Sequence, residues 1–292
     1  MTDHERLVGG MSSVVVLCTF TDQEPLVLRV IDDAEWLERD PGIIAQEAEA
    51  LRLLRHSAVV APNWVADQVE EGIGRLLMTR VTGRMQVATD EINNRIDAMA
   101  DLAAAIAASP LPADHRLPPW RTWVPTDRQP PPWGNQAMWN EAISFHRSRP
   151  APAIAEPVLL HRDFHPLNIL WFGGGGGPSA DSATGQAAVV DWVNACVGHP
   201  HAELAHCRWN LSVTVDPTAA DRFLQRYLDV TATDGCTTPD HFDPWWDVDS
   251  VLDKFTASID NSGWHAVGRT DLTDDRIIAA SETMLRSALN RL

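Results

Sequence analysis

Short apolar runs alternate with turn residues over the first part of the chain, a pattern typical of β-strands. Four such runs predict strands over residues 14–20, 26–30, 59–66 and 75–81. The first two are separated only by the turn-forming stretch TDQEP, which predicts an antiparallel hairpin. Between the two pairs, apolar residues recur at helical spacing and predict a helix over residues 43–54. Residues 1–83 are therefore expected to form a small α+β lobe with an antiparallel sheet.

The pattern becomes mainly helical from residue 84 onward. Apolar residues at helical spacing predict helices over residues 90–108, 136–148, 200–214, 217–229, 244–258 and 273–291. Short apolar runs predict strands over 157–160, 168–172 and 187–190, while the proline-rich stretch 110–133 predicts an ordered segment without a helix. Residues 173–185, with five consecutive glycines, have the composition of a flexible loop. A second, larger and mainly helical lobe is expected over residues 84–292.

Composition limits the kinds of protein that this chain can be. Its 292 residues, 45% of them hydrophobic, suffice for two lobes that share a cleft. The formal net charge of −17 argues against a nucleic-acid partner and would suit a cationic small molecule, although solubility alone explains such acidity more simply. No stretch approaches the roughly 18 uninterrupted apolar residues of a membrane span. The polar N-terminus is unlike a secretory signal, and four scattered cysteines predict a cytoplasmic protein with free thiols.

The sharpest chemical signal is the run HRDFHPLN at residues 161–168, followed after two predicted strands by Asp191. Phosphoryl transfer needs a carboxylate that orients and deprotonates the attacking hydroxyl, and a second carboxylate and an amide oxygen that hold Mg²⁺. Asp163 fits the first role, and Asp191 and Asn168 fit the metal site. A capping or turn role would explain Asp163 alone, but not the compound pattern.

These segments resemble a known family. HRDFHPLNIL and VVDWVNACVGHPHAELAHCRWNL are similar to the catalytic and metal-binding segments of the aminoglycoside phosphotransferase family, a branch of the protein-kinase-like fold, and above all to its bacterial HRDxHPxN members. The resemblance is strong over residues 158–211 and weak over 1–83, and beyond 211 it rests on helical pattern alone. It implies a two-lobed fold, ATP or GTP as donor, Mg²⁺, and a hydroxyl of a small polar or cationic molecule as acceptor. Antibiotic resistance is the family's most familiar role.

The resemblance also implies roles in the N-terminal lobe. Arg29 stands where the phosphate-contacting lysine is usual, and Glu47 lies on the following helix where that residue's partner is expected, with Glu49 as the alternative. A solvated strand arginine is the competing interpretation of Arg29. Further residues expected near the nucleotide are Ser12 and Ser13 beside the first strand and Met78, Arg80 and Val81 in the segment that links the lobes.

The remaining candidates support the catalytic loop or face the acceptor. The resemblance implies that His161 and Glu203 brace the loop, whereas His165 either faces the acceptor or packs. The helical part over residues 200–292 is expected to bind the acceptor. Trp246, Asp249 and Asp253 share one helical face there and would suit an amino sugar or polyamine, although a solvated acidic face explains the pattern at least as well.

The leading hypothesis is therefore a small-molecule O-phosphotransferase with direct transfer to a hydroxyl oriented by Asp163. A metabolite or sugar kinase without a resistance role uses the same chemistry and stays open. A nucleotide-binding pseudoenzyme is a further alternative, because the glycine-rich loop is weak and the usual lysine is missing. A protein kinase is disfavoured, since no activation-loop signature such as APE follows Asp191.

Overall fold

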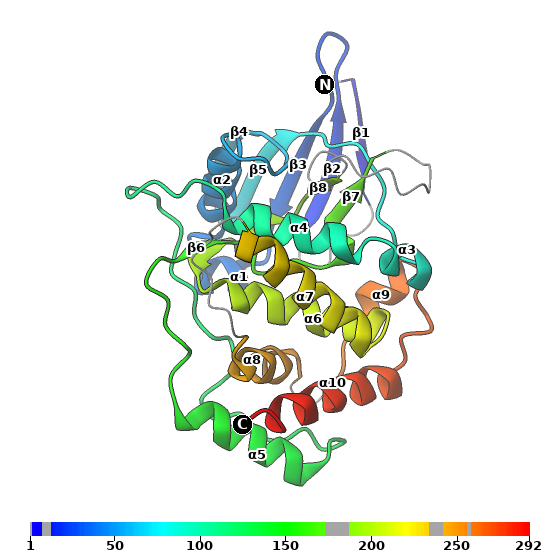
Figure 1. The fold of residues 1–292 in the computed structure, drawn as a ribbon. Coiled ribbons are helices and arrows are strands. Elements are labelled where there is room, and N and C mark those ends of the chain that lie inside the picture. The colour runs from blue at the N-terminus through cyan, green and yellow to red at the C-terminus, as the bar shows by residue number, and fades with distance from the viewer. Residues whose placement is uncertain (1, 8–12, 173–186, 234–241, 256–257) are drawn as a thin grey trace.

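The computed structural model describes residues 2–7, 13–172, 187–233, 242–255 and 258–292. Ser12 and the glycine-rich stretch 173–185 therefore lie outside the described residues. Figure 1 shows two lobes, an antiparallel sheet with a helix at the top and a helical lobe below. This is the architecture that the sequence predicts.

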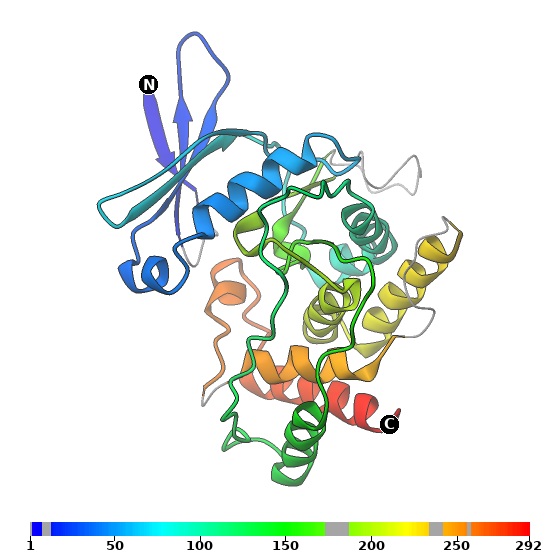
Figure 2. The same cartoon turned by 90° about the vertical axis from the view of Figure 1, so that its left-hand side faces the viewer.

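The N-terminal lobe is built on a five-stranded antiparallel sheet with the order β1-β2-β3-β5-β4. Its strands are β1 (Asp3–Arg6), β2 (Val14–Thr19), β3 (Leu26–Ile31), β4 (Trp64–Glu70) and β5 (Ile73–Thr79). Helix α2 (Ile43–Leu54), at its predicted bounds, buries its apolar face between the sheet and the C-terminal lobe (Figure 2). At Gly74 in β5 an added Cβ would lie 2.6 Å from the side chain of Ile44, so this close approach of strand and helix requires glycine.

Two elements of this lobe, β1 and α1 (Ala34–Arg39), lie outside the segments predicted from the sequence. Strand β1 is polar and exposed throughout, so backbone pairing with β2 makes it a strand rather than a buried face. Helix α1 is a short helix whose first turn is capped by the side chain of Asp33. Strand β4 begins later than the predicted 59–66, because Val60 instead pairs with Ala188 in the other lobe.

The C-terminal lobe consists of helices around two small strand pairs. The helices are α3 (Thr89–Asn93), α4 (Ile96–Ala107), α5 (Gln136–Ser148), α6 (Pro200–Thr214), α7 (Pro217–Thr233), α8 (Pro244–Lys254), α9 (Ser262–Ala266) and α10 (Asp274–Leu289). The single helix predicted over 90–108 is two helices, because the chain turns at Asn94 and Arg95. The segment 110–133 contains no helix, as predicted, and is pinned by the Trp120 N–H, which donates to the Val197 carbonyl at 2.7 Å.

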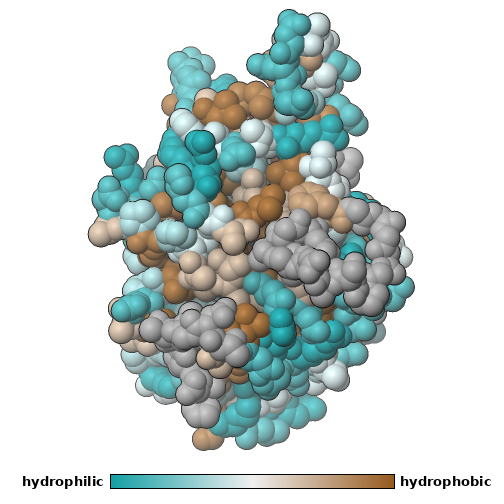
Figure 3. All heavy atoms as spheres, turned by 45° about the horizontal axis from the view of Figure 1, so that its top comes forward, coloured by the Kyte–Doolittle hydropathy of each residue, from teal (hydrophilic) through white to brown (hydrophobic). Residues whose placement is uncertain are grey.

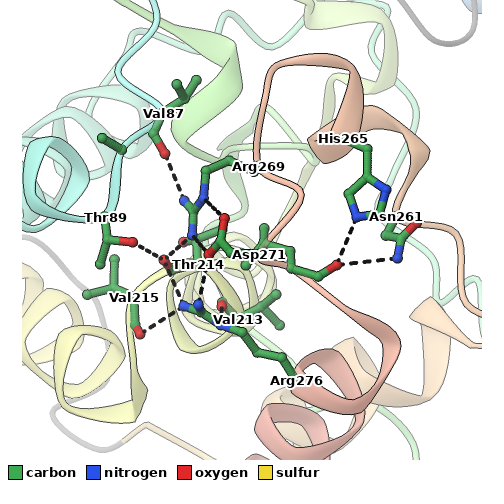
Figure 4. Close-up of polar contacts among 12 residues, drawn as sticks. Val87, Thr89, Val213, Thr214, Val215, Asn261, His265, Arg269, Asp271 and Arg276 are labelled. Atoms are coloured by element: carbon green, nitrogen blue, oxygen red, sulfur yellow. Dashed lines mark hydrogen bonds and ion pairs between the residues drawn. The ribbon is translucent and has the colours of Figure 1, made fainter.

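Helix α6 is the centre of this lobe, since all its residues except Trp209 are buried. Its C-terminus needs partners for its last carbonyl groups. Figure 4 shows that Arg269 and Arg276 supply them: Arg269 donates to the Thr214 carbonyl at 2.9 Å and the Val87 carbonyl at 2.7 Å, and Arg276 donates to the Val213 carbonyl at 3.0 Å. Two cations at the negative end of the helix dipole are also favourable electrostatically. The segment around α9 is thereby tied to the end of α6.

This arrangement gives a stability prediction. Replacing Arg269 with Met is expected to lower the free energy of unfolding by about 2–4 kcal/mol, because two carbonyl groups lose a buried charged donor. Replacing Arg276 with Met should cost only about 1 kcal/mol, since that side chain is 34% exposed and water can replace its contacts. Urea unfolding of both variants measures the difference. Equal losses would show that burial of the arginine is not what matters.

Hydrophilic residues predominate at the outer edges of the face shown in Figure 3, with hydrophobic residues interspersed among them. Large hydrophobic residues that are exposed include Val65 and Val69 on the edge strand β4, and Trp123. Within the described ranges, no helix is long and apolar enough to cross a membrane.

Candidate active site

The predicted catalytic loop joins two strand pairs. It follows β6 (Val158–Leu160), which pairs with β9 (Cys196–Gly198), and ends in the short 3₁₀ helix η1 (Pro166–Asn168). Strand β7 (Ile169–Trp171) then pairs with β8 (Ala187–Val189), and the Val190 N–H donates to the Asn168 carbonyl at 3.0 Å. This pairing brings the backbone of Asn168 beside that of Asp191, although the two residues are far apart in sequence.

The backbone is strained on both sides of this site. Arg162 and Asp191 both have a φ of 70°, in the left-handed region that non-glycine residues rarely adopt. Such conformations persist where the surroundings fix them, and they concentrate at functional sites. At Arg162 the guanidinium group lies over the ring of Trp123, 4.0 Å from its centroid.

His161 and Glu203 hold the catalytic loop from beneath. The carboxylate of Glu203, on α6, accepts the backbone N–H groups of His161 at 2.7 Å and Arg162 at 2.8 Å. The buried ring of His161 has Nε2 2.8 Å from the Val190 carbonyl, while its Nδ1 accepts the Asp163 N–H at 3.2 Å. One side chain thus ties the loop to α6 and the other ties it to the strand end before Asp191.

The contacts of Glu203 predict what its replacement does. The substitution Glu203→Gln keeps the size but turns an amide N–H₂ group toward a backbone N–H of the loop. We expect an unfolding free energy lower by about 1–3 kcal/mol and a kcat lower by about 10–100-fold, because the loop loses its position. Glu203→Asp, which keeps both acceptor oxygens, should cost less activity. Unfolding curves and kcat test this, and unchanged kcat in the Gln variant would mean that other contacts position the loop.

Asp163 is contacted by one amide and two imidazole side chains and is partly exposed. Its Oδ2 lies 3.2 Å from the amide nitrogen of Asn168, which also donates to the Asp163 backbone carbonyl at 2.9 Å. Its Oδ1 lies 3.0 Å from Nε2 of His206 and 3.5 Å from Nε2 of His165. Burial alone would raise the pKa of Asp163, but the two histidines outweigh it and hold that pKa well below the usual value. With 32% of its side chain exposed, Asp163 is an ionised carboxylate that a substrate can reach.

Arg29 joins the N-terminal lobe to this site. Its buried guanidinium group has Nε 3.0 Å from Oε2 of Glu47 and Nη2 2.8 Å from Oδ1 of Asp191, and Nη1 donates to Oγ of Ser13 at 3.0 Å. Burial lowers the pKa of Arg29, but Asp191 and Glu47 outweigh it and raise that pKa, so the group stays charged. For Glu47, burial is the dominant effect and raises the pKa to about 7 despite Arg29.

The segment that links the lobes follows β5 directly. Met78 is buried near the end of that strand, pairing in register with Val27 of β3, whereas Arg80 is exposed and Val81 half-buried after it. Gly83 then passes close to β7, where an added Cβ would lie 3.0 Å from Cβ of Leu170, and its φ is 139°. A glycine is therefore required at the point where the chain enters the second lobe.

A cleft of about 850 Å³ opens between the lobes. Its lining combines three arginines, four aspartates, two tryptophans and three other residues: Arg6, Arg39, Arg121, Asp32, Asp33, Asp40, Asp253, Trp36, Trp123, Ser13, Val14 and Asn194. Ser13 and Asp253 are the members of this lining that the sequence singled out, and they connect the cleft to Arg29 and to α8.

The structure does not bring Trp246 and Asp249 to this cleft. Trp246 is 1% exposed and packs edge-on against Trp120, with ring centroids 5.0 Å apart. Asp249 is 3% exposed and lies 2.8 Å from Nε2 of His146. The shared helical face predicted for these residues is thus mostly core, and only Asp253, near the end of α8, reaches the cleft.

His206 is a neighbour of the site that the sequence did not indicate. It lies on α6, one turn after Glu203, and is 4% exposed. Helical spacing from Glu203 could have placed it on the same side of α6, but nothing in the sequence indicates that this side meets Asp163. Arg208, two residues further along α6, is instead structural, because its Nε donates to Oδ1 of the buried Asp247 at 3.0 Å.

The sequence model of the phosphotransferase enzyme family (APH) matches residues 3–239. The chain belongs to this family. No curated protein sequence matches it at a significant level. The family match confirms the resemblance that the catalytic motif indicates, and the protein is a phosphotransferase.

Solved structures of this kind share the fold at low sequence identity. A thermostable mutant of the aminoglycoside phosphotransferase APH(4)-Ia has a TM-score of 0.59 and 18% identity, over 98% of this chain and 94% of that one. The amicoumacin kinase hAmiN has a TM-score of 0.63 and 10% identity, over 97% and 88%. The choline kinase LicA from Streptococcus pneumoniae has a TM-score of 0.58 and 15% identity, over 99% and 93%. At these identities the likeness establishes the two-lobed kinase-like fold.

The residues present suit a hard divalent cation in a kinase of this family. Asn168 uses its amide nitrogen on Asp163, so its carbonyl oxygen is the atom available to a metal. Asp191 has 26% of its side chain exposed beside Arg29. Among the described residues no group of three or more His, Cys, Asp or Glu side chains is arranged to hold a metal by itself. One carboxylate and one amide fit a cation such as Mg²⁺, which takes its other ligands from water and phosphates.

Proposed function

We propose that this phosphotransferase moves the γ-phosphoryl group of ATP or GTP to a hydroxyl group of a small polar molecule. The observation that carries the proposal is the carboxylate of Asp163, which is ionised, partly exposed and contacted by Asn168, His165 and His206. In the reaction the acceptor oxygen forms a bond to the γ-phosphorus while the bond to the β–γ bridging oxygen breaks. Asp163 orients the hydroxyl group and takes its proton.

Each remaining site residue has a part in this proposal. Arg29, positioned by Glu47, contacts the phosphates, and Ser13 lies beside them. Mg²⁺ on Asn168 and Asp191 would neutralise charge that develops on the phosphates. The backbone near Met78, Arg80 and Val81 would receive the nucleotide base, and this segment would serve as the hinge between lobes 1–83 and 84–292.

The cleft between the lobes, which Asp253 lines, is proposed as the acceptor site. Its carboxylates and its two tryptophan faces favour a polar acceptor with hydroxyl and amino groups. Related structures hold such molecules: APH(4)-Ia is seen with ADP and hygromycin B, and hAmiN with AMP-PNP, Ca²⁺ and amicoumacin. Asp253 and His165 would contact the acceptor, whereas the burial of Trp246 and Asp249 leaves those two side chains in supporting positions.

The test is a transfer assay with purified protein, ATP or GTP, Mg²⁺ and a panel of acceptors. The panel contains aminoglycosides, macrolides, amino sugars, nucleosides and choline-like alcohols, and phosphorylated product is detected by mass spectrometry. Product that depends on Mg²⁺ and disappears with EDTA supports the proposal. A preference for a common metabolite over antibiotics would identify a housekeeping kinase. Mg²⁺-dependent nucleotide binding without transfer to any acceptor would identify a pseudoenzyme instead.

A further inference from the structure

A buried histidine and the chain's one lysine stand in a row behind Asp163. Nε2 of His206 lies 3.0 Å from Oδ1 of Asp163, and Nδ1 of the same ring lies 3.0 Å from Nζ of Lys254 at the end of α8. His206 is 4% exposed, and the Lys254 side chain is 17% exposed. The 22 other basic residues among Lys and Arg are all arginine. The contact therefore uses a side chain that the composition otherwise avoids.

The hydrogen-bonding capacity of these groups fixes the form of the ring. A lysine ammonium group has only donors, so Nδ1 of His206 must accept from it. A neutral imidazole then carries its proton on Nε2, which faces the carboxylate of Asp163. Burial, followed by the charge of Lys254, lowers the pKa of His206 to about 3, so the ring stays neutral in this position. The ring therefore presents an N–H donor to Asp163 without carrying a positive charge itself.

The row continues to the cleft. Nζ of Lys254 also lies 3.3 Å from Oδ2 of Asp253, which lines the cleft proposed for the acceptor. Four side chains thus form a row that begins at the wall of the cleft and ends at Asp163, the proposed base. Helix α8 supplies Asp253 and Lys254, α6 supplies His206, and the catalytic loop supplies Asp163, so the row depends on how the two helices pack.

We propose that Lys254 and His206 are positioning residues for phosphoryl transfer, in which Lys254 sets the tautomer of His206 and His206 fixes the rotamer of Asp163. The inference rests on the proposed function of Asp163. A carboxylate has about four lone-pair positions; with Oδ1 held by His206 and one position on Oδ2 used by Asn168, the other position on Oδ2 stays available to the acceptor hydroxyl group. His206 does not take the proton of the acceptor hydroxyl group, because its Nδ1 accepts from Lys254 and its Nε2 already carries a proton.

The first test observes the ring directly. In ¹⁵N-labelled wild-type protein, the imidazole nitrogens of His206 are expected to show the Nε2–H tautomer, with no change to the imidazolium form between about pH 5 and 8. Assignment comes from the signals that disappear in His206→Phe. An Nδ1–H tautomer would overturn the inference whether or not an acceptor has been found, so this measurement is independent of the proposed function.

The second test is kinetic and uses matched variants. Lys254→Met and His206→Phe keep the volume but remove the donor, and kcat should fall about 10–100-fold with little change in the nucleotide KM. Lys254→Arg keeps a donor-only cation and should recover most of the activity. Arg222→Met, which removes a cation from the exposed ion pair between Arg222 on α7 and Asp97, is the control and should behave as wild type.

The pH profile separates positioning from a merely structural role. In Lys254→Met the cation that suppresses protonation of His206 is gone, while the charged and titratable neighbours Asp163, His165 and Asp253 remain. Burial still lowers the pKa of His206 in that variant, so the acidic limb of its kcat–pH profile should move to higher pH than in wild type and Lys254→Arg while staying below the ordinary histidine range. Unchanged kcat and pH profile in Lys254→Met and His206→Phe, with an active wild type, would overturn the inference. An inactive wild type would instead count against the proposed function.

Discussion

Replacing Asp163 with Asn is expected to lower kcat by about 10²–10⁴-fold while nucleotide binding stays within a few-fold of wild type. The amide oxygen can still face Nε2 of His206. The new N–H₂ group cannot accept the 3.2 Å bond from Asn168, but the shorter bond from Asn168 to the backbone carbonyl remains, so the loop should keep most of its shape. The same N–H₂ group would then face the acceptor hydroxyl group, where it can donate a hydrogen bond but cannot take a proton. The loss should therefore fall on kcat and not on stability.

The measurement combines initial rates with nucleotide titration and thermal unfolding. Asp22→Asn is a suitable control, because Asp22 is an exposed turn residue between β2 and β3 and has no part in the site. If Asp163→Asn formed phosphorylated product at the wild-type rate, another group would have to be the base. If the variant unfolded at a clearly lower temperature, the kinetic loss could no longer be assigned to proton transfer.

The second large effect is expected at Arg29. Arg29→Met removes a buried cation that faces two carboxylates and a hydroxyl group. Breaking a buried ion pair from one side typically costs about 3–5 kcal/mol, because the remaining charge is left unpaired. We expect a loss of this size in the free energy of unfolding, and nucleotide affinity lower by at least about 10-fold because the charged phosphate contact proposed for Arg29 is removed.

A variant of Glu47, the ion-pair partner of Arg29, separates the effect on stability from the effect on nucleotide affinity. Its pKa is already raised to about 7 by burial, so without Arg29 it would take up a proton near neutral pH. The double variant Arg29→Met with Glu47→Gln should therefore be more stable than Arg29→Met alone, since the more deeply buried of the two unpaired carboxyl groups is gone. Nucleotide affinity should not recover, because the phosphate contact is still missing. Urea unfolding and nucleotide titration of the single and double variants provide the cycle.

Arg29→Lys should give an intermediate result. Lysine keeps the charge, but an ammonium group is a single point donor and cannot match the three directions in which the guanidinium group meets Glu47, Asp191 and Ser13. Wild-type affinity and stability in this variant would show that only the charge matters. The arginine would then be a consequence of composition and not of geometry.

The sequence determined those features whose cause is local. Helix α2 lies at its predicted bounds, because the spacing of its apolar residues defines one buried face. The catalytic loop could be recognised because Asp163 and Asn168 lie within eight consecutive residues, 161–168, so their separation depends on one short loop. The hairpin of β2 and β3 likewise follows from two apolar runs and the turn between them.

Tertiary structure decided which faces meet. The helical face of Trp246, Asp249 and Asp253 could be read from spacing, but whether it meets solvent, core or cleft depends on the helices packed around α8. His206 and Lys254 are 48 residues apart and carry no motif, so only the packing of α6 on α8 brings them together. The same holds for Arg29 and Asp191, which come from different lobes. A motif predicts how residues close in sequence are arranged, whereas contacts between distant elements depend on how the whole chain packs.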